Sequence, residues 1–156
     1  VIGPLSSPAK VKRQVVGVFE RKLLKVFAEA LKNLNLKKAL IVNSQDGLDE
    51  ISPYAKTDIV ELSEGKIKEY IFNPKDLGIK SNNFENIIGK DPDYNAEKMK
   101  EIFKGKDNDF SISVCLNAAA GLLAAEKSNS FKHGYEQLRS HILSGKVINH
   151  ISKFIK

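Results

Sequence analysis

The stretch of sequence that decides the fold reads NSQDGLDEISP and occupies residues 43–53. It follows an apolar run, residues 39–42, and such a run bounded by turn residues predicts a buried strand of a parallel sheet. Ligands of open α/β sheets bind beyond the carboxyl ends of the strands. The acidic stretch therefore occupies the position at which a ligand site is expected.

Three acids lie in this stretch, Asp46, Asp49 and Glu50, and the last two are adjacent. Adjacent carboxylates repel each other unless water or a cation shares them, and Mg²⁺ typically binds one or two carboxylates together with substrate phosphates. A structural interpretation stays open, in which Asp46-Gly47 bends the chain and Asp49 caps a short helical turn. On chemistry alone, the stretch fits both a magnesium site and a polar turn.

Hydrophobic periodicity predicts a βαβ unit that leads into the acidic stretch. Residues 14–19 and 38–42 are predicted strands, and residues 21–34 between them place apolar side chains on one face at helical spacing. Such a unit implies parallel strands joined by a right-handed crossover. Beyond the acidic stretch, polar–apolar alternation predicts an antiparallel hairpin of residues 58–62 and 66–72.

Helices dominate the second half of the sequence, after a predicted loop over residues 80–90. Capping and periodicity predict helices from Pro92 to near Gly105, over residues 110–127, from the cap Ser130 to Gly145, and over residues 147–155. The helix over residues 110–127 is rich in alanine and closely flanked by charges, which indicates a buried central helix and not a membrane span.

Four segments together resemble a known family. They read GPLSSPAK at residues 3–10, RQVVGV at 13–18, DGLDEIS at 46–52 and LNAAA at 116–120. Their order and spacing are similar to those of anthranilate phosphoribosyltransferase of tryptophan biosynthesis, over essentially the whole chain but only the second half of the family's chain. The resemblance implies an α/β fold of the nucleoside phosphorylase/phosphoribosyltransferase kind. This chain would supply the C-terminal part of a mostly parallel sheet with an antiparallel hairpin, flanked by helices.

The resemblance also implies an activity and its site residues. The family is a pentosyltransferase that moves the phosphoribosyl group of phosphoribosyl pyrophosphate to anthranilate, giving N-(5-phosphoribosyl)anthranilate and diphosphate. Gly3 and Pro4 match a pair that lines the family's anthranilate site, although a rigid turn would also explain them. Asp49 and Glu50 match the acidic pair that holds Mg²⁺, and a hard cation stabilises the charge that accumulates on leaving diphosphate.

Parts of the family's pattern are altered or are expected upstream of Val1. The family often has His-Gly where this chain has Asn43-Ser44, which implies a change in loop packing more than in metal binding. Its glycine-rich phosphate loop, its anthranilate-binding arginine and its N-terminal helical region, through which the complete enzyme forms a homodimer, would precede residue 1. We therefore expect residues 1–156 to form the C-terminal part of the α/β domain, without transferase activity of their own.

Composition bounds the remaining possibilities. A chain of 156 residues with 42% hydrophobic and 28% charged residues suits one globular domain. The net charge of +6 favours anionic partners, but only Lys10, Lys12 and Arg13 form a tight basic group, so a solvated surface is favoured over a nucleic-acid interface. One cysteine, Cys115, and no apolar leader or run long enough to cross a bilayer predict a cytoplasmic protein without a membrane partner.

The remaining polar residues are given structural roles. Cys115 is predicted to be a buried thiol, and Asn117 a hydrogen-bonded polar residue within an apolar helix. The three histidines, His133, His141 and His150, lack the helical spacing of a zinc site. Two other classes of function stay open: a nucleic-acid-binding relative without transferase activity, and a pyrimidine nucleoside phosphorylase, which the motifs fit less well than the transferase.

Overall fold

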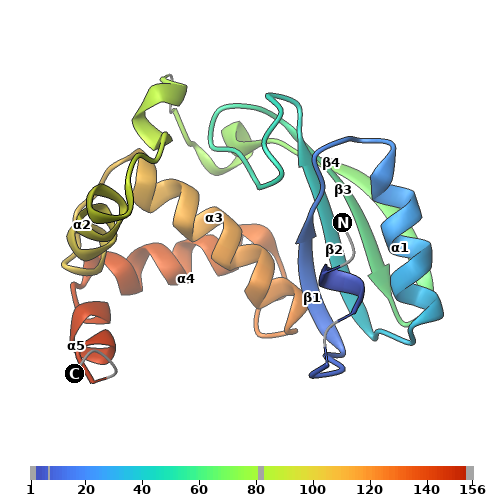
Figure 1. Cartoon of the computed structure of the whole chain (residues 1–156). Coiled ribbons are helices and arrows are strands. Elements are labelled where there is room, and N and C mark those ends of the chain that lie inside the picture. Colours follow the sequence, from blue (N-terminus) through green and yellow to red (C-terminus); the bar gives the residue numbers. More distant parts are fainter. Residues whose placement is uncertain (1–2, 7, 81–82, 154–156) are drawn as a thin grey trace.

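The computed structural model describes residues 3–6, 8–80 and 83–153, which adopt an α/β fold (Figure 1). Its four-stranded sheet has the order β1-β2-β3-β4, formed by Arg13–Gly17, Lys38–Ser44, Thr57–Ser63 and Lys66–Phe72. β1 and β2 are parallel, whereas β2–β3 and β3–β4 are antiparallel. The predicted fold class and hairpin are confirmed. Within the described residues the sheet is mixed, because a helical crossover joins only the first two strands and the loop over residues 45–56 returns the chain in the opposite direction.

The helices agree with the periodicity of the sequence. The crossover helix is α1, Leu23–Asn33, and the second half of the chain forms α2 (Pro92–Phe103), α3 (Asp109–Ala124), α4 (Phe131–Leu143) and α5 (Val147–Ile151). Short 3₁₀ turns are η1 (Gly3–Leu5), η2 (Pro74–Leu77) and η3 (Phe84–Ile87). α5 is shorter than predicted, and residues 154–156 lie outside the described residues. No helix among the described residues is long and apolar enough to cross a membrane.

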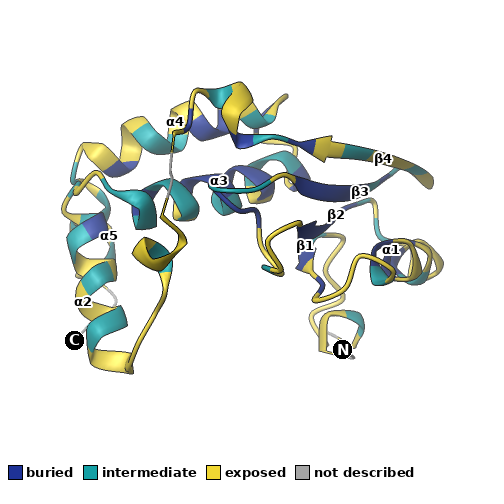
Figure 2. Ribbon diagram, turned by 90° about the horizontal axis from the view of Figure 1, so that it is seen from above, coloured by how far each residue is buried: buried dark blue, intermediate teal, exposed yellow. Residues whose placement is uncertain are grey.

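Two hydrophobic clusters lie on opposite faces of the sheet. α1 packs on one face, where Leu24, Phe27 and Leu31 meet Ile41 and Val60. α3 and α4 cover the other face, on which the cluster includes Leu40, Val42, Ile51, Ile59, Cys115, Leu116 and Tyr135. Figure 2 shows that burial is concentrated on β2 and β3, the two central strands. The loop over residues 45–56, called the acidic loop below, therefore leaves the sheet from a strand that is covered on both faces.

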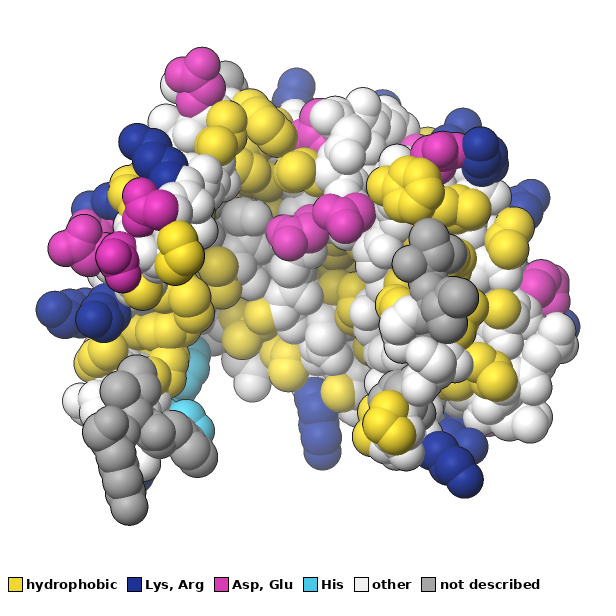
Figure 3. All heavy atoms as spheres, in the orientation of Figure 1, with side chains coloured by type: hydrophobic (Ala, Val, Ile, Leu, Met, Phe, Trp, Pro, Cys, Tyr) yellow, Lys and Arg dark blue, Asp and Glu magenta, His cyan; other side chains and the backbone are white. Residues whose placement is uncertain are grey.

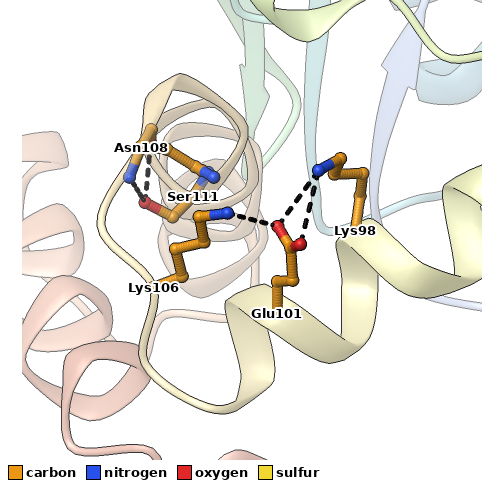
Figure 4. A network of polar contacts seen from close by, with 5 residues as sticks. All are labelled: Lys98, Glu101, Lys106, Asn108 and Ser111. Atoms are coloured by element: carbon orange, nitrogen blue, oxygen red, sulfur yellow. Dashed lines mark hydrogen bonds and ion pairs between the residues drawn. The ribbon is translucent and has the colours of Figure 1, made fainter.

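Local polar contacts close the end of α2 and the start of α3. Figure 4 shows Glu101 accepting hydrogen bonds from Lys98 (3.2 Å) and Lys106 (2.7 Å), and these contacts lower the pKa of the Glu101 carboxyl. Asn108 and Ser111 form a capping box, in which each side chain bonds the other residue's backbone N–H at 3.0 Å. Such reciprocal bonds satisfy two otherwise unpaired donors at the helix start. The first turn of α3 is thus closed by its own side chains.

Arg139 of α4 ties that helix to the same region. Its guanidinium donates to Ser111 Oγ (2.9 Å) and to Asp107 Oδ1 (2.6 Å). Cys115 lies one turn further along α3 and is fully buried, as predicted. Burial raises the pKa of this thiol to about 11, so it stays protonated at neutral pH and behaves as a small apolar side chain.

β1 leaves one edge of the sheet open among the described residues, and we expect the 156-residue chain to self-associate there. Lys38 N–H donates to Lys12 O and Val18 N–H to Val42 O, so alternate residues of β1 face β2. Arg13, Val15 and Gly17 then direct their backbone groups outward, and an unpaired edge is a template for another strand. Sedimentation over a wide concentration range measures this association. A well-folded monomer at the highest concentration would contradict the expectation.

Candidate functional site

The loop after β2 is built around a tight turn at its start. Ser44 N–H donates to Leu48 O (2.8 Å), and Gly47 N–H donates to Ser44 O (3.0 Å). Gly47 has a φ of 95°, a conformation that side chains rarely adopt. The predicted bend at Asp46-Gly47 is confirmed, and it turns the following acids back across the end of the sheet.

Asp46 serves the loop itself. Its Oδ2 accepts from Ser52 Oγ at 2.6 Å, while the same hydroxyl oxygen accepts from the backbone N–H groups of Tyr54 (3.0 Å) and Ala55 (3.3 Å). These contacts close the loop between its turn and its return to β3. Of the three acids, Asp46 is therefore the structural one.

Asp49 and Glu50 are placed differently. Both are exposed, and neither side chain makes a hydrogen bond or ion pair within the described part of the chain. No helix begins at Asp49, so the alternative in which it caps a helical turn is wrong. Figure 3 shows acidic side chains at the upper rim of the hollow between the sheet and the helices α2 and α5.

The two carboxylates fit Mg²⁺ as partial ligands. They are adjacent and exposed, and no described residue pairs with them, which leaves their oxygens accessible to a hard cation. No group of three or more His, Cys, Asp and Glu gathers within residues 3–6, 8–80 and 83–153. Mg²⁺ is commonly bound by one or two carboxylates, with waters and substrate phosphates completing its octahedral shell. The donor set present here matches that pattern and not an all-protein cage.

A pocket of about 210 Å³ lies beside the acidic loop. Its lining includes Pro4, the end of β1 with the following Phe19, two side chains of α1, and Asp49. The structure thus brings Pro4 and Asp49 together from two separate motifs of the resemblance. Gly3 and Glu50 are not part of that lining, and Gly3 is exposed, with no described atom beyond its chain neighbours within 4 Å of the point that a β-carbon would occupy.

Gly17, the last residue of β1, is a site residue whose role sequence reasoning missed. The carbonyl oxygen of Asp49 lies 1.7 Å from the point that a β-carbon on Gly17 would occupy. Only glycine allows the acidic loop to approach the strand this closely. The available signal was an isolated glycine at the end of a strand pattern, which often marks a close approach of backbone.

Asn117 of α3 holds the other side of the acidic loop. Its Oδ1 accepts from Ile51 N–H (2.9 Å), and its Nδ2 donates to Ile51 O (3.0 Å). The prediction of a hydrogen-bonded polar residue is confirmed, and its partner is the residue that follows Glu50. Sequence alone could not name that partner, because 66 positions separate the two residues.

Asn43 and Ser44 act in loop packing, as their departure from the family pattern implied. Asn43 is buried at the end of β2 and donates from Nδ2 to Val18 O at 2.7 Å. Ser44 Oγ donates to Lys56 O at 3.2 Å. The first bond ties the end of β2 to the residue that follows β1, and the second ties the two ends of the acidic loop together.

Tyr54 links the loop to the start of α3. Its hydroxyl donates to Asp109 Oδ2 (3.1 Å), which also accepts from Asn86 Nδ2 (2.7 Å). Burial and the neighbouring Asp109 carboxylate raise the pKa of Tyr54 above its ordinary value. The phenol therefore stays neutral at physiological pH and serves as a hydrogen-bond donor, not as a base.

Comparison with known proteins places this geometry in a family. The sequence model described as "Glycosyl transferase family, a/b domain" matches residues 1–148. An anthranilate phosphoribosyltransferase of Pelagibacter ubique (strain HTCC1062) is 60% identical over 153 residues, which are 98% of this chain and 46% of that protein. The chain thus spans about half the length of the curated relatives it matches.

Solved structures agree with the sequence comparison. The crystal structure of anthranilate phosphoribosyltransferase from Thermus thermophilus superposes with a TM-score of 0.88 and 31% identity, covering 99% of this chain and 45% of that one. A Ser-to-Ala variant of the Saccharomyces cerevisiae enzyme with Mg bound gives a TM-score of 0.87 and 25% identity, covering 99% of this chain and 46% of its own. The chain therefore belongs to the glycosyl transferase family defined by this a/b domain.

Proposed function

We propose that the complete protein is an anthranilate phosphoribosyltransferase, which transfers the phosphoribosyl group of phosphoribosyl pyrophosphate to the nitrogen of anthranilate and releases diphosphate. The names of the similar proteins support this activity. The observation that carries it is the pocket at the end of β1, where Pro4 and Asp49 lie together. Residues implied in acceptor binding and in metal binding then border one cavity.

Asp49 and Glu50 would hold Mg²⁺ in this reaction. When bound, the ion neutralises the negative charge that develops on diphosphate as it leaves. The Mg-bound yeast structure supports the choice of metal. Both carboxylates are exposed and have no partner among residues 3–6, 8–80 and 83–153, so they are available to the ion. Its remaining ligands would be water and the oxygens of the substrate.

Pro4, which lines the pocket, would contact anthranilate there, and Gly3, which precedes it outside the lining, would border the bound ring. The Pro4 carbonyl is fixed there, because it accepts a hydrogen bond from Gln14 Nε2 of β1 at 3.3 Å. The amine of anthranilate is already a nucleophile once the ring is oriented, so the reaction needs little acid–base chemistry. Positioning of the two substrates and neutralisation of charge would supply most of the rate.

An assay of the complete protein tests the proposal. Incubation with anthranilate, phosphoribosyl pyrophosphate and Mg²⁺ should give phosphoribosyl anthranilate, and chelation of the metal should stop the reaction. Parallel incubations with thymidine and inorganic phosphate, and titrations with duplex DNA over a salt series, measure the two alternative functions. Phosphorolysis of thymidine or salt-sensitive DNA binding, without any anthranilate product, would replace the proposed function.

The assembly and location of the complete protein are proposed on the same basis. We infer that it forms a homodimer, as the family resemblance implies, and that it works in the cytoplasm, in keeping with its single buried cysteine.

A further inference from the structure

The backbone next to Asp49 and Glu50 is hydrogen-bonded by a side chain of α3. Asn117 forms two hydrogen bonds with Ile51, accepting one from its N–H (2.9 Å) and donating one to its carbonyl (3.0 Å). The amide nitrogen of Asn117 also donates to Ser113 O at 3.1 Å, within the same helix. With both hydrogens and the oxygen engaged, the amide has one orientation, and Ile51 has one position relative to α3.

Close packing also holds the loop, on the α3 side at Ile51 and on the β1 side at Asp49. Ile51 is fully buried in the cluster between the sheet and α3, so moving the backbone there would expose or displace its side chain. Two residues earlier, the Asp49 carbonyl lies against Gly17 of β1. The backbone over residues 49–51 is thus held between β1 and α3, while the side chains of Asp49 and Glu50 remain exposed.

The helix that presents Asn117 is supported by contacts at its N-terminus. Its first turn is closed by the capping box of Asn108 and Ser111, and Arg139 of α4 binds Ser111 Oγ at 2.9 Å. Tyr54 adds a direct bond from the acidic loop to Asp109 at the start of α3. Asn117 therefore bonds the acidic backbone from a helix that α4 and the loop itself also contact.

We propose that Asn117 is a positioning residue for the divalent cation. Through its bonds to Ile51 it holds the Asp49 and Glu50 carboxylates at the separation and in the direction that the ion requires. This inference rests on the proposed function, since it assigns a cation to those carboxylates. Mg²⁺ demands near-ideal octahedral geometry, so small displacements of its ligands weaken binding. Supporting residues beyond the direct ligands typically contribute about 10- to 100-fold to metal affinity.

The test measures binding of Mn²⁺ to the complete protein in the presence of phosphoribosyl pyrophosphate. The electron paramagnetic resonance signal of free Mn²⁺ reports how much of the ion is bound. Asn117→Ser is the main variant, because a serine hydroxyl can bond the Ser113 carbonyl within the helix but is too short to bridge both groups of Ile51. We expect Mn²⁺ binding to weaken about 10-fold or more. The Mg²⁺ concentration for half-maximal activity should rise by the same factor.

Ser130→Ala is the matched control. It removes the side chain that caps α4 by accepting from His133 N–H at 3.2 Å, so it lowers stability without touching the acidic loop. The unfolding midpoints of both variants should fall, but only Asn117→Ser should weaken Mn²⁺ binding. Asn117→Ala is a second variant, which keeps the test decisive if one substitution prevents folding.

Three outcomes are distinguishable. Weaker Mn²⁺ binding in the Asn117 variants with unchanged binding in Ser130→Ala supports the inference. If the Asn117 variants and Ser130→Ala all bind Mn²⁺ normally, while Asp49→Asn with Glu50→Gln abolishes binding, the role of Asn117 is overturned. The metal assignment then stays intact. Unchanged binding in the double acid variant overturns the metal assignment, and the role of Asn117 falls with it.

Discussion

Replacement of Asp49 by Asn together with Glu50 by Gln should lower the Mg²⁺-dependent turnover of the complete protein by about 100-fold or more. Neutral amides replace two carboxylates, so the cation loses two negative charges. The third acid of the loop, Asp46, is bonded to Ser52 and does not replace them. Stabilisation of developing charge by a metal supplies several kcal/mol, and each 1.4 kcal/mol is about a tenfold change in rate. Initial rates over a Mg²⁺ series measure the loss.

A control pair separates this effect from the general change in charge. Asp93→Asn with Glu97→Gln removes the same two charges from the exposed surface of α2, far from the acidic loop in the chain. It should leave turnover close to that of the unmodified protein. If the Asp49 and Glu50 variant kept full activity at every Mg²⁺ concentration, the assignment of these acids to the metal would be wrong.

Fold prediction succeeded where the signal is local. The predicted strands, the hairpin and the helices follow from periodicity and from end signals such as Asp91-Pro92, whose carboxylate accepts from Tyr94 N–H at 2.8 Å. The antiparallel pairing of β2 with β3 was not predicted, because it depends on the path of the loop over residues 45–56. A loop without a helix allows the next strand to run in the opposite direction, but the loop sequence does not show that β3 pairs with β2.

The candidate site shows the same division between local and distant information. Adjacency together with the family resemblance singled out Asp49 and Glu50, and neither side chain makes a hydrogen bond or ion pair with another described residue. The chemistry of Asp46 could not be separated from theirs by sequence, since its partner Ser52 is defined by the fold of the loop. The supports at Gly17 and Asn117 come from other elements and appear only when β1, the loop and α3 are assembled.

Substitution of Gly17 by Ala should displace the acidic loop and reduce the activity of the complete protein by about 100-fold. The new β-carbon would lie 1.7 Å from the Asp49 carbonyl oxygen and 2.8 Å from its carbonyl carbon. Both atoms belong to the backbone, so the contact can be relieved only by moving the chain that carries the acids. A misplacement of about 1 Å can cost on the order of 100-fold in rate. Initial rates and Mn²⁺ affinity measure the effect.

Gly121→Ala supplies the comparison for this change. Gly121 lies in α3, and no described atom beyond its chain neighbours and its own helix backbone comes within 4 Å of its potential β-carbon. Alanine there should therefore stabilise the helix by about 1 kcal/mol and leave turnover unchanged. Gly17→Ala should instead lower the unfolding midpoint, since overpacking typically costs about 1–3 kcal/mol. Equal midpoints and equal rates for Gly17→Ala and the unmodified protein would contradict the close approach of β1 and the acidic loop. Loss of metal affinity with a cooperative unfolding transition would show that this glycine places the acids as well as admitting the loop.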